Sequence, residues 1–259
     1  MVSPVADLPT LSDIGIHPPP SILASKAFAY AKHHCTEAVY NHAMRSAYWA
    51  MIIAKKLPEF HNNPRLNLEA VFVSCILHDM GWANTPELLS SDKRFEVDSA
   101  NIARDFIYDE QIHLSTEPWS YDTIQRVWDS IALHTTPSIA RHAAPDVALT
   151  NLGITADFAG PGLPGPDGKP LITYGEYCAV MKVFPRAGFN SEGFKDIMCW
   201  LCRTKPETTY DNFVGEYGCQ FGPDGNGEGV EGFKKAWAAG QSSKILMPGL
   251  EKLESIDPK

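Results

Sequence analysis

The sequence has no excess of positive charge and no long apolar run. It carries 22 Lys and Arg residues against 31 Asp and Glu residues, a net charge of −9. A sequence-independent nucleic-acid partner or an anionic membrane partner would require a cationic face, so we expect neither. The longest purely apolar stretch is eight residues, 47–54, whereas a membrane helix needs about 20. We therefore expect no membrane segment.

Signals for export and for a disulfide framework are also missing. The N-terminus shows no basic region followed by an apolar run, so we expect no secretory peptide. Six cysteines are scattered over 259 residues, and those in apolar helical segments behave as small hydrophobes. The C-x-x-C spacing of Cys199 and Cys202 has no second pair, which favours a helical core over a zinc or redox site. A cytoplasmic location is the expectation.

Strand signals are weak, because the sequence has no sustained alternation of apolar and polar residues. The helical period dominates instead. Segments with this period are residues 21–35, 39–57, 68–77, 95–107, 121–133, 144–159, 174–184, 191–202 and 230–239. We predict an all-α protein, a helical bundle of about seven to nine helices. Its expected parts are an extended lead-in over residues 1–20, a helical domain over 21–213, and a glycine-rich extension with a short C-terminal helix over 214–259.

Histidines and carboxylates mark the candidate site. His78 and Asp79 end one predicted helix, and His42 lies on the helix before it. Asp157 lies among apolar neighbours, where a carboxylate is costly without a cation as partner. Taken singly, each such residue is more often structural. Together, imidazole nitrogens and carboxylate oxygens from three helices suit Zn²⁺, Fe or Mn.

The order His, His-Asp, Asp on successive helices resembles the HD-domain superfamily of all-α metalloproteins, and within it the fungal cyanamide hydratase branch. The resemblance is closest at residues 40–49, Tyr-Asn-His-Ala-Met-Arg-Ser-Ala-Tyr-Trp, and at residues 74–81, Ser-Cys-Ile-Leu-His-Asp-Met-Gly. It continues more loosely through residues 94–96, 131–134, 157–160 and 184–186. It covers roughly residues 20–205.

The resemblance implies one divalent metal ion, with zinc as the first choice and iron as the alternative. The ligands it implies are His42, His78, Asp79 and Asp157. It also implies that Glu96 is an acid/base carboxylate near the metal and that His134 lines the pocket. The residues expected to contact substrate are Asn41, Arg45, Trp82 and Thr135. The sequence also allows a second metal ion, because His113, His134 and His142 lie between the His78-Asp79 pair and Asp157.

Three classes of function follow. The first is a hydratase or hydrolase of a small neutral molecule. In it, a metal-bound hydroxide attacks an electrophilic carbon, such as the nitrile carbon of cyanamide. Glu96 or His134 then returns the proton to the nitrogen. The second is a phosphohydrolase acting on a nucleotide or another phosphomonoester. Many phosphohydrolases of the superfamily, like its di-iron oxygenases, carry Lys where this chain has Trp82, so the first class is favoured. The third is a di-iron oxygenase of the same superfamily or a non-catalytic binding module. The expected partner is a small molecule, and self-association is left open.

Overall fold

The structure is a computed structural model that describes residues 7–113 and 117–257. In these residues the regular elements are twelve α-helices and five short 3-10 helices. This confirms the all-α prediction. The pattern missed three α-helices: α6 (Pro137–Ala140), α10 (Val214–Phe221) and α12 (Ser243–Glu254). Among the described residues, no helix combines the length and the apolar character needed to cross a membrane.

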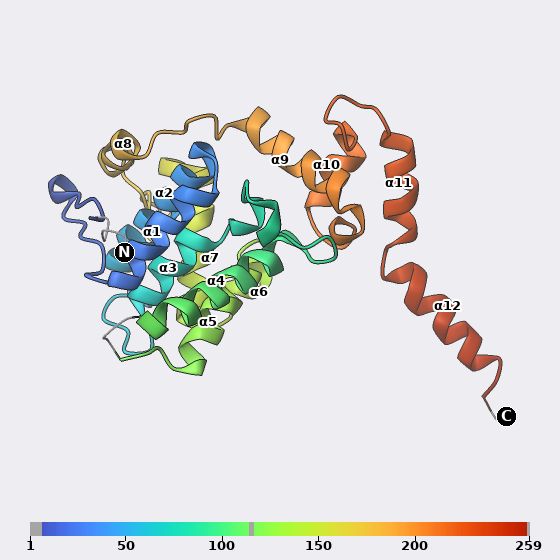
Figure 1. Ribbon diagram of the computed structural model, residues 1–259, viewed down its shortest axis with the longest axis horizontal. Coiled ribbons are helices and arrows are strands. Elements are labelled where there is room, and N and C mark those ends of the chain that lie inside the picture. The colour runs from blue at the N-terminus through green and yellow to red at the C-terminus, as the bar shows by residue number, and fades with distance from the viewer. Residues whose placement is uncertain (1–6, 114–116, 258–259) are drawn as a thin grey trace. The chain divides into compact units, whose positions relative to one another are not determined.

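The chain divides into two compact units, Met1–Leu89 with Phe95–Gly188, and Ser90–Arg94 with Phe189–Lys259. The expected boundary at residue 213 therefore falls inside the second unit. Besides α6, the first unit holds α1 (Ile22–His34), α2 (Glu37–Lys56), α3 (Leu68–Leu77), α4 (Phe95–His113), α5 (Tyr121–Ala132), α7 (Pro145–Ala159) and α8 (Tyr174–Val183) (Figure 1). Besides α10 and α12, the second holds α9 (Ser191–Thr204) and α11 (Val230–Ala239).

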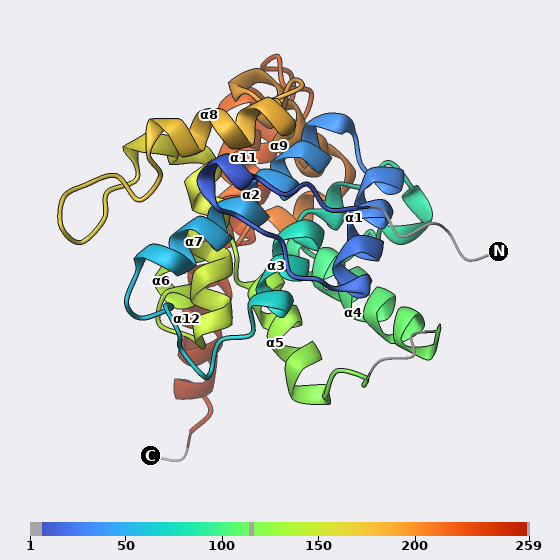
Figure 2. The same ribbon diagram turned by 90° about the vertical axis from the view of Figure 1, so that its left-hand side faces the viewer.

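Helix α2 is the central helix of the first unit. The Thr36 hydroxyl caps it by accepting a hydrogen bond from the backbone N–H of Val39, as a threonine before the first turn commonly does. Every residue from 39 to 54 is buried, because α3 and α7 pack along this helix (Figure 2). A helix buried on all sides still contains His42 and Arg45, so these polar side chains need partners inside the core.

The close contact between α2 and α7 depends on Gly153. A Cβ atom at this position would lie 2.7 Å from the carbonyl oxygen of Ser46 and 2.8 Å from the Cβ of Ala50. No side chain fits there without moving a helix. One turn further along α7, this approach brings Asp157 against α2.

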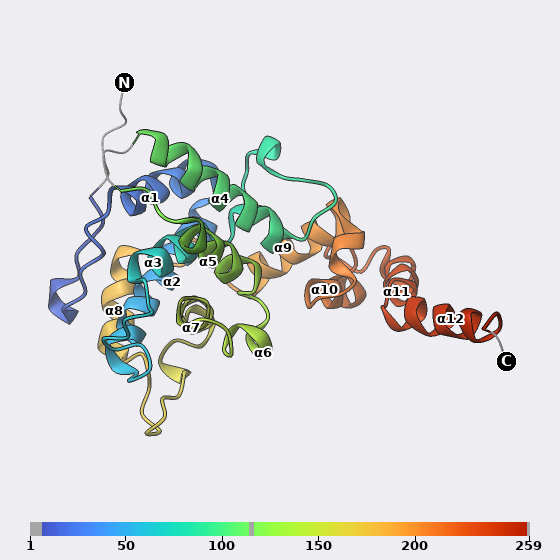
Figure 3. The same cartoon turned by 90° about the horizontal axis from the view of Figure 1, so that it is seen from below.

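The turn after α3 is packed against the first turn of α4. Helix α3 is followed by a 3-10 turn, Met80–Trp82. The backbone N–H of Gly81 donates to the hydroxyl of Ser99 (2.7 Å), and a Cβ on Gly81 would lie only 2.2 Å from the carbonyl oxygen of Phe95. Glycine at this position therefore allows the segment that carries Glu96 to lie directly on the His-Asp turn. Figure 3 shows α4 beside α5, which completes this side of the unit.

Residues 7–20 of the expected lead-in pack on the first unit. They are extended apart from a 3-10 turn, Ser12–Ile14, and the hydroxyl of Tyr48 donates to the carbonyl of Pro9. The first six residues of that segment lie outside the described residues. In the second unit, Cys199 and Cys202 are buried free thiols, and Cys202 donates to the carbonyl of Val214 (3.3 Å). The prediction that these two cysteines belong to a helical core is confirmed.

Candidate metal centre

Four buried side chains converge on one point of the first unit. They are His42 on α2, His78 and Asp79 at the end of α3, and His134 just after α5. The Nε2 atoms of His42 and His78 are 3.2 Å apart. One oxygen of Asp79, Oδ2, lies 2.9 Å from Nε2 of His78 and 3.4 Å from Nε2 of His42. The other oxygen lies 3.6 Å from Nε2 of His134.

The outer ring nitrogens show where the histidine protons are. Nδ1 of His78 lies 2.7 Å from the carbonyl oxygen of Cys75, and Nδ1 of His134 lies 2.6 Å from that of Ile131. A carbonyl oxygen only accepts, so both rings carry the proton on Nδ1. Nδ1 of His42 faces a carboxylate oxygen of Asp157 at 2.7 Å and donates in the same way. In the neutral rings all three Nε2 atoms therefore present lone pairs to the centre.

Burial and charge keep these groups in the states that bind metal. Burial lowers the pKa of His42, and it lowers the pKa of His134 to about 4, so both rings are neutral near pH 7. Burial opposes ionisation of Asp79, whereas positive charge on the adjacent rings of His78 and His42 would lower the pKa of that carboxyl; a cation bound between them would act in the same direction.

The centre lacks a positive charge of its own. Neither oxygen of Asp79 accepts a hydrogen bond from the described residues. Lone pairs and an ionised carboxylate that face one another in the core repel unless a cation lies between them. His42, His78 and Asp79 offer ligand atoms that all lie within 4.8 Å of one another. Imidazole nitrogen together with carboxylate oxygen suits a divalent transition metal, so the residues fit such an ion.

Asp157 is brought to the far side of His42 and not to the converging atoms. Besides Nδ1 of His42, it accepts from Nε and Nη2 of Arg45 (2.7 and 2.8 Å), Nε1 of Trp49 (3.0 Å) and Nη1 of Arg186 (3.2 Å). Burial opposes ionisation, but His42 and Arg45 hold the pKa of Asp157 well below its ordinary value. The cation that this carboxylate needs is thus an arginine. From the sequence, Asp157 was expected as a ligand at the centre and His134 as a residue that lines the pocket. In the structure it is His134 that faces Asp79.

Glu96 and Thr135 lie together beside the centre. Glu96 is buried in the first turn of α4, and the hydroxyl of Thr135 donates to its Oε1 atom (2.6 Å). The negative charge of Glu96 acts on the titration of His134, which places the carboxylate near that ring. The ring of Phe95 packs between Trp82 (5.0 Å between centroids) and His134 (5.7 Å). The structure thus brings Glu96, Thr135 and Trp82 to one side of the centre, next to His134.

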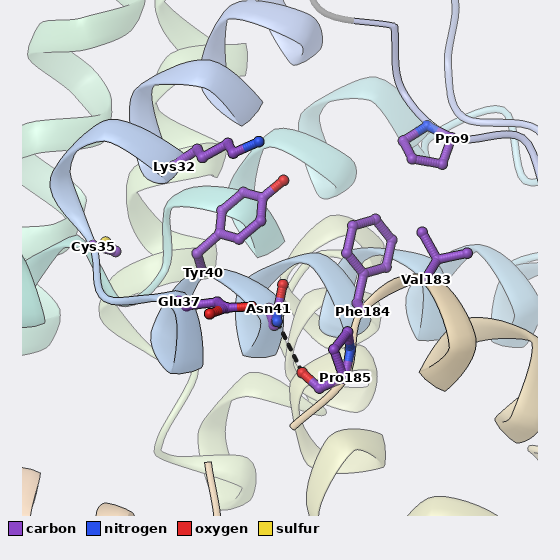
Figure 4. A pocket seen from close by; sticks show the side chains of 9 residues that line it. All are labelled: Pro9, Lys32, Cys35, Glu37, Tyr40, Asn41, Val183, Phe184 and Pro185. Carbon is purple, nitrogen blue, oxygen red and sulfur yellow. Dashed lines mark hydrogen bonds between the residues drawn. The ribbon is translucent and has the colours of Figure 1, made fainter. Parts of the chain in front are cut away.

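The other two expected substrate residues, Asn41 and Arg45, bind the chain that follows α8. Arg45 is fully buried, and its Nη1 donates to the carbonyls of Phe184 and Pro185. The amide of Asn41 also donates to the carbonyl of Pro185 (2.9 Å), as Figure 4 shows. Asn41 lines a pocket of about 460 Å³ that none of the four converging side chains lines. Both residues hold the segment at 184–185 against α2.

Three residues that hold Asp157 and His134 in place were not predicted from the sequence. Trp49 and Arg186 both donate to Asp157. The third, Asn151, is buried on α7 and donates to the carbonyl of His134 (2.8 Å), which fixes the turn after α5. A signal for Asn151 was present, because an amide inside an apolar helical run needs a partner. The two other histidines considered for a second ion, His113 and His142, are exposed.

Comparison with known proteins gives one match. A family model described as HD domain matches residues 39–181, which is more than half of the chain and contains all four converging residues. No curated protein matches the chain.

Proposed function

The chain belongs to the HD-domain family, whose members are generally metal-dependent hydrolases, and from this premise we propose that it hydrolyses or hydrates a small neutral organic molecule at an electrophilic carbon. The observation that carries the proposal is the buried cluster of His42, His78 and Asp79, whose ligand atoms lie within 4.8 Å of one another, with Nε2 of His134 3.6 Å from Asp79. His42, His78, Asp79 and His134 would hold the ion, zinc in the first place and iron as the alternative. A divalent metal lowers the pKa of a coordinated water and so supplies a nucleophile near neutral pH.

The residues around the centre keep its ligand atoms in place. The carbonyls of Cys75 and Ile131 fix the rings of His78 and His134, and Asp157 fixes the ring of His42. Such outer partners set the tautomer of a ligating histidine and raise its basicity. In this proposal Asp157 is a positioning residue whose own charge is balanced by Arg45 and Arg186.

Glu96 is the group that moves the proton. Its carboxylate accepts a hydrogen bond from the hydroxyl of Thr135 at Oε1, and in this proposal it exchanges a proton with substrate. Proton transfer by a positioned carboxylate typically contributes about 10²–10⁴-fold to the rate. Thr135 orients Glu96, and this contact gives a reason for a threonine at the position after His134.

A neutral substrate fits the charges around the centre better than a phosphate. Phosphate is usually bound by Arg or Lys donors. Arg45 and Arg186, whose guanidinium groups contact this network, both bind Asp157. The side of the centre next to His134 presents the aromatic rings of Phe95 and Trp82 and the carboxylate of Glu96. We propose a nitrile-type carbon, as in the cyanamide hydratase branch that the sequence resembles.

The test is a substrate screen on the full chain at equal metal loading, with cyanamide, small nitriles and a panel of phosphomonoesters. We expect conversion of a nitrile-type compound to the corresponding amide or urea, and loss of that activity in Glu96→Gln. The matched control is Glu110→Gln, which removes an ion-paired carboxylate elsewhere on α4. Phosphomonoesterase activity with kcat/KM above about 10⁴ M⁻¹s⁻¹ and no reaction at carbon would overturn the proposal.

A further inference from the structure

A second, larger pocket lies on the first unit, away from the metal centre. Its volume is about 950 Å³, and neither the four converging residues nor Glu96 line it. Its walls come from the connection after α2, from α5, from the start of α7, and from the loop between α7 and α8. Figure 2 shows the connection after α2 beside α7. Nothing in the proposed reaction uses this pocket.

Positive charge gathers at this pocket in a chain whose net charge is negative. Arg65, Arg126 and Arg141 line it from three separate segments, and Glu59 is the one carboxylate among the lining residues. The buried carboxylate of Asp146 lies 3.4 Å from Arg126 and balances part of that charge. The start of α7 also lines the pocket, and Asp146 lies in the first turn of that helix. The pocket is therefore suited to an anion.

Two of the arginines are held by buried partners. Arg126 pairs with Asp146, which also accepts the backbone N–H of Asn67 (2.9 Å). Nε of Arg141 donates to the amide oxygen of Asn151 (3.4 Å). Both partners are 1% exposed. A ligand that binds side chains already held in place loses less of its binding energy to ordering them.

Apart from Glu59 and Asn63, the rest of the pocket lining is apolar. Its lining includes the side chains of Leu57, Phe60, Ala148, Leu152 and Leu171, together with three prolines. An inorganic anion would leave this surface uncovered, whereas a molecule with an apolar body would cover it. Guanidinium groups bind planar carboxylates and tetrahedral phosphates with two parallel hydrogen bonds. We propose that this pocket binds a small amphiphilic organic anion, with a carboxylate or phosphate head on the arginines and a compact apolar body over Phe60 and Leu152.

The test measures binding to the full chain by isothermal titration calorimetry. The probes are octyl phosphate and octanoate, which also separates the two head groups. Inorganic phosphate lacks the apolar body, and octylamine has the opposite charge. We expect at least one of the two amphiphilic anions to bind about tenfold or more tightly than either control compound, because both the head and the body contribute.

Variants of the lining arginines test whether the probe binds in this pocket. Arg65→Gln changes an exposed residue and should weaken binding about tenfold, as should Arg141→Gln. Arg104→Gln removes a half-buried arginine from α4, outside the pocket, and should leave binding unchanged. Circular dichroism checks that each variant is folded, and because Arg65 is exposed its variant tests the site even if Arg141→Gln is unstable.

A further variant separates this pocket from the metal centre. His78→Ala removes a converging side chain, and binding of the amphiphilic probe should persist in it whether or not the proposed reaction is correct. Loss of binding in His78→Ala would show that the probe binds at the metal centre and would overturn the inference. Equal affinity for inorganic phosphate and octyl phosphate, or full affinity in Arg65→Gln and Arg141→Gln, would overturn it as well.

Discussion

The role of Asp157 can be decided by a single change, Asp157→Asn, which keeps the shape of the side chain and removes its charge. If Asp157 positions His42, the metal should still bind, because the four converging atoms are unchanged. An asparagine oxygen can still accept the Nδ1 proton of His42, but as a weaker partner. Loss of such an outer partner typically costs about 10–100-fold in metal affinity.

The same change should lower stability, because it leaves Arg45 buried without its counter-ion. Arg45 is fully buried and places Nε and Nη2 on the two oxygens of Asp157. Breaking one partner of a buried pair costs about 3–5 kcal/mol. In a domain of this size, each 1 kcal/mol shifts Tm by about 2–4 °C. The expected drop in Tm is therefore about 6–20 °C.

Two assays separate the effects: a zinc titration against a chromophoric chelator, and thermal unfolding followed by circular dichroism. The matched control is Asp146→Asn, which alters another buried carboxylate paired with an arginine and should lower Tm while leaving zinc affinity unchanged. Complete loss of zinc binding in Asp157→Asn would refute the reasoning and make Asp157 a ligand.

Three further predictions follow from the same contacts. His134→Ala should lose most of the bound metal, whereas the exposed His142→Ala should keep it; retention of full metal in His134→Ala, by elemental analysis, would return His134 to a pocket role. Glu96→Gln should keep metal and Tm while kcat falls by at least about a hundredfold, and Thr135→Val should show a smaller loss; an unchanged kcat in Glu96→Gln would rule out the proton-transfer role. At Glu176, burial opposes ionisation, but Lys56 and the Thr173 cap hold its pKa below the ordinary 4.5. Its stabilisation is therefore present above pH 4.5 and is lost as the pH falls through the lowered pKa; Glu176→Gln should cost about 1 kcal/mol at pH 7 and progressively less below pH 4.5 in urea unfolding, and a cost that does not change with pH would contradict this.

The sequence was most informative where a local pattern determines the outcome. Helical periodicity predicted nine of the helices, and the His78-Asp79 doublet with His42 predicted the converging cluster. Short helices such as α6 lack enough residues to show a period. The partner of Asp157 was harder to predict, because an apolar segment with one carboxylate indicates that a cation is needed but not which cation.

The features that could not be predicted depend on contacts between helices that are far apart in the sequence. Gly153 allows α2 and α7 to approach, and Gly81 allows α4 to lie on the His-Asp turn. Both glycines stand in helical or turn segments where a single sequence gives no sign of the neighbour that requires them. The pairing of Thr135 with Glu96 across 39 positions depends on the second of these contacts.

The most direct test of the central claim is the metal content of the full chain purified without chelators, measured by elemental analysis beside His78→Ala. We predict about one equivalent of a divalent transition metal in the wild type and close to none in the variant, because His78→Ala removes one of the imidazole ligands. Less than about a tenth of an equivalent in the wild type, with no uptake of added zinc or iron, would contradict the assignment of this cluster as a metal centre.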